Sequence, residues 1–322
     1  MAVAGLLHAN RHTLRLWEFD RREYQRLIAD RSNEKKLPGV RIPPEIEIIH
    51  DLDLAIRDVD YIVLALPAQK VRSVCQSLVG FLDHPVGIVN LAKGIELGTL
   101  MRMSEVIASV CDQSTVKDVA TISGPSHAEE VARQIPTSVV AASNDESYAR
   151  TLQAIFSNAA FRVYRSDDLV GVELGGSLKN IIAIAAGIVQ GLGFGDNTLG
   201  ALLTRGLAEI TRMGVDAGAR ALTFSGLSGI GDLVTTCLSR HSRNRHVGER
   251  IGRGEKLNDI LDSMVMVAEG VDTCRSAYAM SRKYDVEMPI TGEVYYVLFE
   301  DKPPAEAVRD LMGRSLKTEI WS

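Results

Sequence analysis

The chain has few cysteines. Only four occur among its 322 residues, and no two are close enough to form a CxxC pair: Cys75, Cys111, Cys237 and Cys274. Such wide spacing argues against a cysteine metal site and against a disulfide framework. It is typical of a protein kept in a reducing compartment, so we expect a cytoplasmic protein.

The chain also lacks a strong excess of either charge. Its net charge of -5 gives no electrostatic reason to expect a nucleic-acid or membrane partner. A small anionic substrate remains compatible with this balance, because a local cluster of basic residues can act against a mildly acidic background.

No signal peptide or long unbroken apolar run is evident. His8, Asn10 and Arg11 interrupt the first apolar stretch, which also lacks a cleavage site. The longest apolar stretch, residues 180–195, contains several glycines and is too short to span a bilayer comfortably. We therefore predict a soluble protein without membrane insertion.

A glycine-rich phosphate loop is missing as well. The opening, "MAVAGLLHANRHTLRLWEFD", reads as the end of a helix, a turn and a strand with acidic residues at its end. In dinucleotide-binding folds this order follows a first, central strand and a GxGxxG loop. We expect the natural protein to begin upstream with these elements. Without them, two neighbouring strands would lack a ladder partner, so the first domain should fold poorly and hold a pyrophosphate weakly.

The two halves of the chain differ in their predicted secondary structure. Between residues 13 and 165, short apolar or β-branched runs alternate with helical patterns, which predicts a parallel sheet with helices on both faces. After Asp168 the pattern is helical. We predict an α/β dinucleotide-binding domain at 1–166 and an all-α substrate domain at 167–322.

Lys179 is a candidate proton-transfer residue. It precedes an almost wholly apolar helical stretch, "NIIAIAAG", and desolvation there would lower its pKa toward the range of a general acid or base. The alternative is a lysine whose stem covers apolar surface while its amine reaches water. The residues alone leave both interpretations open.

A basic cluster follows a glycine-rich segment in the second half. Gly226, Gly229 and Gly231 predict a tight loop before Asp232. The "SRNR" cluster ahead of the next helix suits a phosphate group, since arginine forks and helix N-termini both bind anions: Ser242, Arg243, Asn244 and Arg245. The alternative is a solvated basic turn, which we favour for Arg240 and Arg245.

Two strand ends in the first half complete the candidate site. Lys93 follows the apolar run "PVGIVN", while Gly124, Ser126 and Ala128 follow "VATIS". Ligands of open parallel sheets bind beyond the carboxyl ends of the strands, so these positions should face one crevice.

The chain closely resembles the NAD(P)-dependent glycerol-3-phosphate dehydrogenase family, and the resemblance runs from the first residue almost to the last. It rests on seven motifs in this order: "NLAKGIE", "SGPSHAEEVA", "ELGGSLKNIIAIAAGIVQGLGFGDN", "TRGLAEITRMG", "LSGIGDLVTTC", "SRNRHVG" and "VAEGVDT". The resemblance implies a Rossmann-type doubly wound sheet followed by a helical substrate domain. It also implies reversible hydride transfer between NAD(P)H and dihydroxyacetone phosphate, giving sn-glycerol 3-phosphate for glycerophospholipid synthesis.

The resemblance assigns roles residue by residue. Lys179 matches the proton-transferring lysine, and Lys93 matches a second lysine beside the reacting carbonyl. Both also match substrate-contacting positions, together with Gly124, Ser126, Asp232, Ser242, Arg243 and Asn244. The positions that match cofactor contacts are Phe19, Lys93, Ala128, Arg243, Val267 and Glu269. The resemblance implies a homodimer and implies no metal.

Cofactor choice is suggested by the end of the second strand. Glu18 and Asp20 can bond ribose hydroxyls and repel a 2′-phosphate, which favours NAD, although Arg21 and Arg22 could accommodate NADP. His127 stands where the family often has an aromatic residue, and we interpret it as structural. Two alternatives stay open: a related lysine-dependent reductase of another small keto acid, such as ketopantoate, or an inactive ligand-binding relative without the glycine loop.

Overall fold

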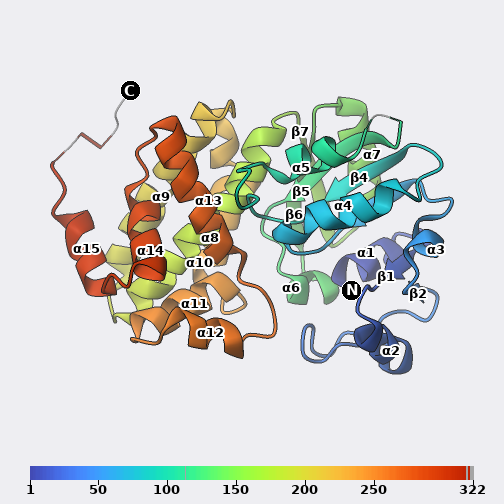
Figure 1. Ribbon diagram of the computed structural model, residues 1–322, viewed down its shortest axis with the longest axis horizontal. Coiled ribbons are helices and arrows are strands. Elements are labelled where there is room, and N and C mark those ends of the chain that lie inside the picture. The colour runs from blue at the N-terminus through green and yellow to red at the C-terminus, as the bar shows by residue number, and fades with distance from the viewer. Residues whose placement is uncertain (113, 317, 320–322) are drawn as a thin grey trace.

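Strands and helices alternate as far as Ser166 in the computed structural model, and the described residues beyond it form helices and loops (Figure 1). The structure describes residues 1–112, 114–316 and 318–319. The strands are β1 (Arg15–Trp17), β2 (Glu47–Ile49), β3 (Tyr61–Leu64), β4 (Val86–Asn90), β5 (Val116–Ser123), β6 (Thr137–Ser143) and β7 (Phe161–Ser166).

Helices connect these strands and then form the second half. Those of the first half are α1 (Ala2–Ala9), α2 (Arg21–Asp30), α3 (Leu52–Ile56), η1 (Ala68–Lys70), α4 (Val71–Val79), α5 (Met103–Val110), α6 (Ala128–Ala132) and α7 (Glu146–Phe156). Those of the second are α8 (Leu169–Gly191), α9 (Asp196–Asp216), η2 (Ala221–Ser225), η3 (Leu227–Gly231), α10 (Asp232–Leu238), α11 (Arg243–Gly252), α12 (Leu257–Ser263), α13 (Glu269–Tyr284), α14 (Pro289–Phe299) and α15 (Pro304–Met312).

Helices cover both faces of the main sheet, as predicted from its continuously apolar strands. Alternate residues of β4 face opposite sides: Ile88 packs in the core formed with α4 and α5, and Val89 in the core formed with α1 and α7. Both residues are fully buried. The first half therefore has the Rossmann-like arrangement of a sheet between two helical layers.

The sheet departs from the all-parallel prediction in one pair. Its strand order is β3-β4-β5-β6-β7, and β5 and β6 are antiparallel while the other neighbours are parallel. The cause is the connection between them, because α6 has only five residues and is too short to return the chain along the sheet. Strands β1 and β2 form a separate two-stranded parallel sheet.

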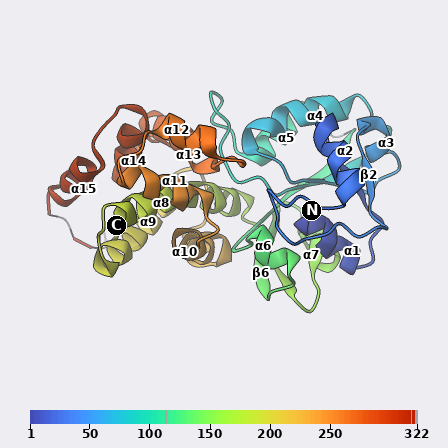
Figure 2. The ribbon, with the colours of Figure 1, turned by 90° about the horizontal axis from the view of Figure 1, so that it is seen from below.

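Helix α8 is the central element of the second half (Figures 1 and 2). It packs against α9, α10, α11 and α13, and Leu174, Leu178 and Ile181 on it are fully buried. The helix begins at Leu169, earlier than the apolar stretch at 180–195. By length and composition it is long and apolar enough to cross a membrane, so the expectation that this stretch is too short was wrong. Its apolar window is entirely buried inside the protein, as in the core helix of a soluble protein.

All four cysteines are free and buried. Cys75 and Cys111 lie in the core of the first half, and Cys237 and Cys274 in that of the second. Burial raises the pKa of the Cys237 thiol to about 12.

Candidate active site

Two lysines share one buried carboxylate where the two halves meet. The Nζ atom of Lys179 lies 2.5 Å from Oδ1 of Asp232, and the Nζ atom of Lys93 lies 2.7 Å from Oδ2. Asp232 therefore uses each of its oxygens to hold one ammonium group.

Three different elements supply this cluster. Lys179 lies in the middle of α8, Asp232 is the first residue of α10, and Lys93 follows the carboxyl end of β4. Lys93 also donates a hydrogen bond of 2.9 Å to the carbonyl oxygen of Gly124, just beyond β5. Gly124 has a φ of +135°, and a Cβ there would press against the backbone of Val139. The two strand ends thus converge on the helical half, as expected from a parallel sheet.

Burial lowers the pKa of Lys179 to about 8, because an ammonium group is poorly solvated there. Asp232 opposes this shift and the charge of Lys93 adds to it. The Lys179 side chain is only 6% exposed, so the alternative of an amine that reaches water is wrong. For Asp232, burial alone would raise the pKa, but the two lysines outweigh it and the net pKa is lowered.

Thr236 belongs to the cluster and was not identified from the sequence. Its Oγ1 atom accepts a hydrogen bond of 2.5 Å from Lys179, one turn after Asp232 on α10. The signal available in the sequence was the i, i+4 spacing of Asp232 and Thr236, which places both on one helix face. Of the glycines predicted to form a tight loop before Asp232, Gly226 precedes the short helical segment η3, and Gly229 and Gly231 lie within it. Gly229 has a non-helical backbone there (φ -97°, ψ -106°).

The basic cluster lies beside α8. Ser242 caps the N-terminus of α11, where its Oγ accepts from the amide of Arg245 at 3.2 Å. Asn244 donates to Oδ1 of Asn180 at 2.9 Å, and its own Oδ1 accepts from the amide of Gly270 at 2.9 Å. Asn244 thereby ties α11 and α13 to the residue that follows Lys179.

The arginines of the cluster differ in their surroundings. Arg243 donates to the carbonyl oxygen of Val267 at 2.7 Å. Arg245 contacts Gln190 and Glu249, and its side chain is only 17% exposed. Our interpretation of Arg245 as a solvated surface residue is therefore wrong: it packs along α8.

Glu269 offers a buried carboxylate oxygen at the junction of the halves. It begins α13, and its Oε1 accepts from the amide of Ala68 in η1 at 3.2 Å. Its Oε2 is buried and has no hydrogen-bond partner among the described residues. Burial raises the pKa of this carboxyl to about 7. An added donor at Oε2 would relieve the missing hydrogen bond.

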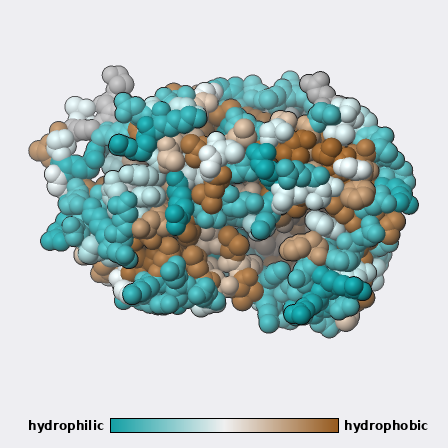
Figure 3. Space-filling view, in the orientation of Figure 1, coloured by the Kyte–Doolittle hydropathy of each residue, from teal (hydrophilic) through white to brown (hydrophobic). Residues whose placement is uncertain are grey.

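The remaining predicted positions are distributed over several elements. Ser126 donates to the carbonyl oxygen of Gly124 at 3.0 Å, and Ala128 begins α6. Phe19 follows β1 and is 72% exposed, and Val267 is 46% exposed. The face in Figure 3 is recessed where the two halves meet, with hydrophobic residues along its border.

His127, interpreted as structural, lies within electrostatic reach of Lys179. Burial lowers the pKa of its imidazole, and the charge of Lys179 adds to this effect. Its Nε2 atom is buried without a partner among the described residues, and its ring lies 5.9 Å from that of His241.

Comparison with known proteins gives one consistent family. Residues 1–149 and 168–309 match the models for the N- and C-terminal parts of NAD-dependent glycerol-3-phosphate dehydrogenase. Glycerol-3-phosphate dehydrogenase [NAD(P)+] of Chlorobium chlorochromatii is 50% identical over 320 residues, covering 98% of this chain and 95% of the relative. That of Geobacter sulfurreducens is 48% identical over 319 residues, covering 99% and 95%. The crystal structure of glycerol-3-phosphate dehydrogenase from Coxiella burnetii matches with a TM-score of 0.93 at 35% identity, covering 97% of this chain and 95% of that one.

Proposed function

The chain belongs to the NAD-dependent glycerol-3-phosphate dehydrogenase family, and on that premise we propose that Lys179 and Lys93 form its reaction centre. The chain is an NAD(P)-dependent oxidoreductase that interconverts dihydroxyacetone phosphate and sn-glycerol 3-phosphate. The observation that carries the proposal is the single buried carboxylate of Asp232 shared by the two lysines.

Lys179 moves the proton. Because burial brings its pKa to about 8, both of its protonation states are populated near neutral pH. The ammonium form donates a proton to the substrate oxygen during reduction, and the neutral amine removes it during oxidation. Lys93 places a second positive charge beside the same oxygen and stabilises the negative charge that develops there.

Residues of both halves hold the two ligands. Gly124, Ser126, Ser242, Arg243 and Asn244 bind the substrate and its phosphate, which fixes the carbonyl against the lysines. The cofactor supplies the hydride when bound, and it is held by Phe19, Lys93, Ala128, Arg243, Val267 and Glu269. The buried Oε2 of Glu269, which has no partner in the described part of the chain, fits this assignment, because a nucleotide carries hydroxyl and amide donors.

The proposal extends to the whole protein. Residues 1–166 form the dinucleotide-binding domain and 167–322 the substrate domain. The enzyme is cytoplasmic, takes NAD in preference to NADP because of Glu18 and Asp20, and acts as a homodimer. Its product feeds glycerophospholipid synthesis.

The test is a comparison of substrates and of lysine variants. We expect the purified chain to oxidise NADH with dihydroxyacetone phosphate and not with ketopantoate. Lys179→Met should lower kcat by about 10²–10⁴-fold, the usual contribution of a general acid, while NADH binding persists. Lys283→Met, which removes an exposed lysine on α13, is the control and should keep full activity. NADH binding without turnover by the unaltered chain would instead support an inactive relative.

A further inference from the structure

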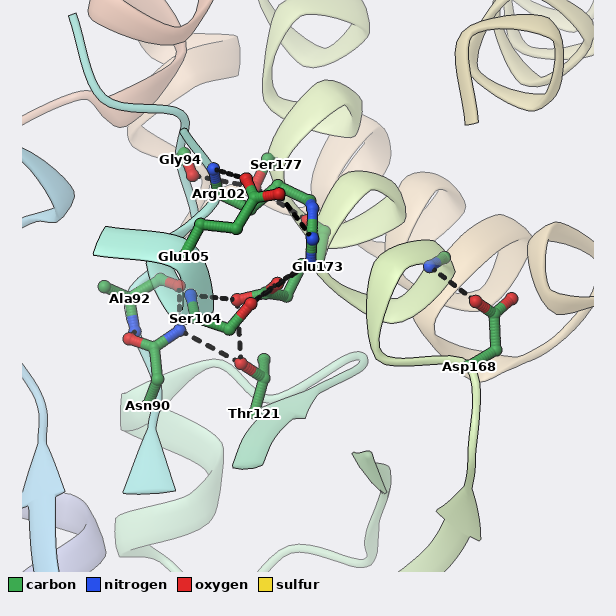
Figure 4. A network of polar contacts seen from close by, with 11 residues as sticks. Asn90, Ala92, Gly94, Arg102, Ser104, Glu105, Thr121, Asp168, Glu173 and Ser177 are labelled. Carbon is green, nitrogen blue, oxygen red and sulfur yellow. Dashed lines mark hydrogen bonds and ion pairs between the residues drawn. The ribbon is translucent and has the colours of Figure 1, made fainter. Parts of the chain in front are cut away.

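Glu173, which precedes Lys179 on α8, carries a buried carboxylate that has no role in the proposed reaction (Figure 4). Oε2 of Glu173 accepts hydrogen bonds of 2.6 Å from both Arg102 and the hydroxyl of Ser104. Oε1 accepts from the amide of Ser104 at 2.8 Å and from the hydroxyl of Thr121 at 3.1 Å. Both carboxylate oxygens of Glu173 therefore accept hydrogen bonds from the first half of the chain.

One of these bonds continues toward Lys93. Thr121 on β5 lies opposite Asn90 on β4, and its Oγ1 accepts from Nδ2 of Asn90 at 3.2 Å. The amide group of Asn90 also donates to the carbonyl oxygen of Ala92 and accepts from its amide, both at 3.0 Å. The contacts therefore run from Glu173 through Thr121 and Asn90 to the backbone of Ala92. Ala92 is the residue before Lys93.

The residue after Lys93 is also in contact with α8. The hydroxyl of Ser177 lies 3.2 Å from the carbonyl oxygen of Gly94, sharing its proton with the carbonyl oxygen of Glu173 at 2.7 Å. The backbone is therefore held on both sides of Lys93 by the helix that carries Lys179.

We propose that Glu173 is a positioning residue that acts through Thr121 and Asn90 to fix the backbone of Lys93. This fixes the place of its long side chain and hence the geometry of the two lysines on Asp232. The inference rests on the proposed function of Lys93 as the second cation of the reaction centre. A lysine side chain has several rotatable bonds, so its backbone anchor limits where the amine can lie.

The alternative is that Glu173 only caps α5 and joins the two halves, since Arg102 and Ser104 lie at the start of that helix. Glu209 provides a matched control. It is also buried, and it accepts from the amides of Ile290 and Thr291, both at 2.8 Å, at the start of α14. Burial raises the pKa of both carboxyls. No bond in its set leads to Lys93.

The experiment compares Glu173→Gln, Glu209→Gln and Thr121→Val. Glu173→Gln replaces one carboxylate oxygen at the start of the relay by a donating NH2 group, and Glu209→Gln makes the same change at a helix cap elsewhere. Thr121→Val breaks the link to Asn90 while the ion pair between Arg102 and Glu173 stays intact, so it decides the question even if Glu173→Gln does not fold.

The pH profile of dihydroxyacetone phosphate reduction is one readout. The charge of Lys93 lowers the pKa of Lys179, whose other charged or titratable neighbours are Asp232, Cys237 and His127. If Lys93 moves away, the pKa of Lys179 rises and the alkaline limb of the profile moves to higher pH. We expect this shift in both relay variants, with a fall in kcat of about 10-fold to 10²-fold, as a misplaced group causes. Glu209→Gln should lose thermal stability but keep the wild-type profile.

Hydrogen exchange gives a readout that does not depend on activity. The amide of Ala92 should exchange faster in Glu173→Gln and Thr121→Val and be unchanged in Glu209→Gln. If the unaltered chain failed to reduce dihydroxyacetone phosphate, the proposed function would fall, and the exchange rates would still test the relay. Wild-type exchange at Ala92 in both relay variants would overturn the inference. So would an equal loss of kcat in Glu209→Gln.

Discussion

At the scale of single residues, the site depends on one carboxylate between two cations. Asp232 lies 2.5 Å from Lys179 and 2.7 Å from Lys93, and it is almost fully buried. Removing one partner of a buried charged cluster leaves an uncompensated charge, which is far more costly than losing an exposed pair. The three side chains therefore form one electrostatic cluster, in which Asp232 raises and Lys93 lowers the pKa of Lys179.

This arrangement predicts opposite pH dependences for the two reaction directions. In the proposed mechanism reduction uses protonated Lys179, so its kcat should be constant at low pH and fall above about pH 8, the pKa of this lysine. Oxidation of glycerol 3-phosphate needs the neutral amine and should rise through the same pH. Steady-state pH profiles measured in both directions check this. Limbs near the ordinary lysine pKa of about 10.4 would contradict it.

At the scale of elements, helices α8 and α11 pack with their backbones close together. A Cβ on Gly248 of α11 would overlap the carbonyl oxygen of Ile184, and one on Gly187 of α8 would overlap that of Arg245. Only glycine permits this approach. The contact matters for function because α11 begins with the residues proposed to bind phosphate.

Gly248→Ala should therefore destabilise the protein by about 1–3 kcal/mol or more, the usual cost of overpacking a core. Gly292→Ala is the matched control on α14, because its Cβ would meet open space. It should be neutral or stabilising by about 0.5–1 kcal/mol, since alanine favours helix. Thermal unfolding of the two variants measures the difference. Equal melting temperatures would show that α8 and α11 can separate without cost.

At the scale of the whole molecule, several polar contacts join the two halves of the chain. Lys93 bonds to Asp232, Arg102 to Glu173 and the amide of Ala68 to Glu269. A cofactor bound between Glu269 and the strand ends would add to these contacts and stabilise both halves together.

We therefore expect NADH at about 100 times its Kd to stabilise the folded protein by about 2.7 kcal/mol. The melting temperature should rise by several degrees in scanning calorimetry. Glu269→Gln should bind NADH more weakly and show a smaller rise at the same concentration, while Lys283→Met should match the unaltered chain. A melting temperature independent of NADH would contradict the proposed place of the cofactor beside Glu269.

Local patterns predicted the alternation of strands and helices and the covered sheet, because each depends on neighbouring residues. They left open whether Lys179 is desolvated or reaches water, and the 6% exposure of its side chain in the packed structure decides between the two. They did not predict that β6 runs antiparallel, which depends on how far a five-residue helix can return the chain. The resemblance named Asp232, but its role as a shared partner of two lysines depends on contacts between distant segments. The relay from Glu173 to Asn90 was missed for the same reason, since its members lie on three separate elements.

The burial of all four cysteines has a practical consequence for spectroscopy. Maleimide dyes and spin labels react with accessible thiolates, and the buried thiols of the native fold are poor targets. A pair of surface cysteines, one on α2 and one on α15, would accept donor and acceptor dyes without first replacing the natural four. The relative movement of the two halves during turnover could then be followed on single molecules of an otherwise unaltered enzyme.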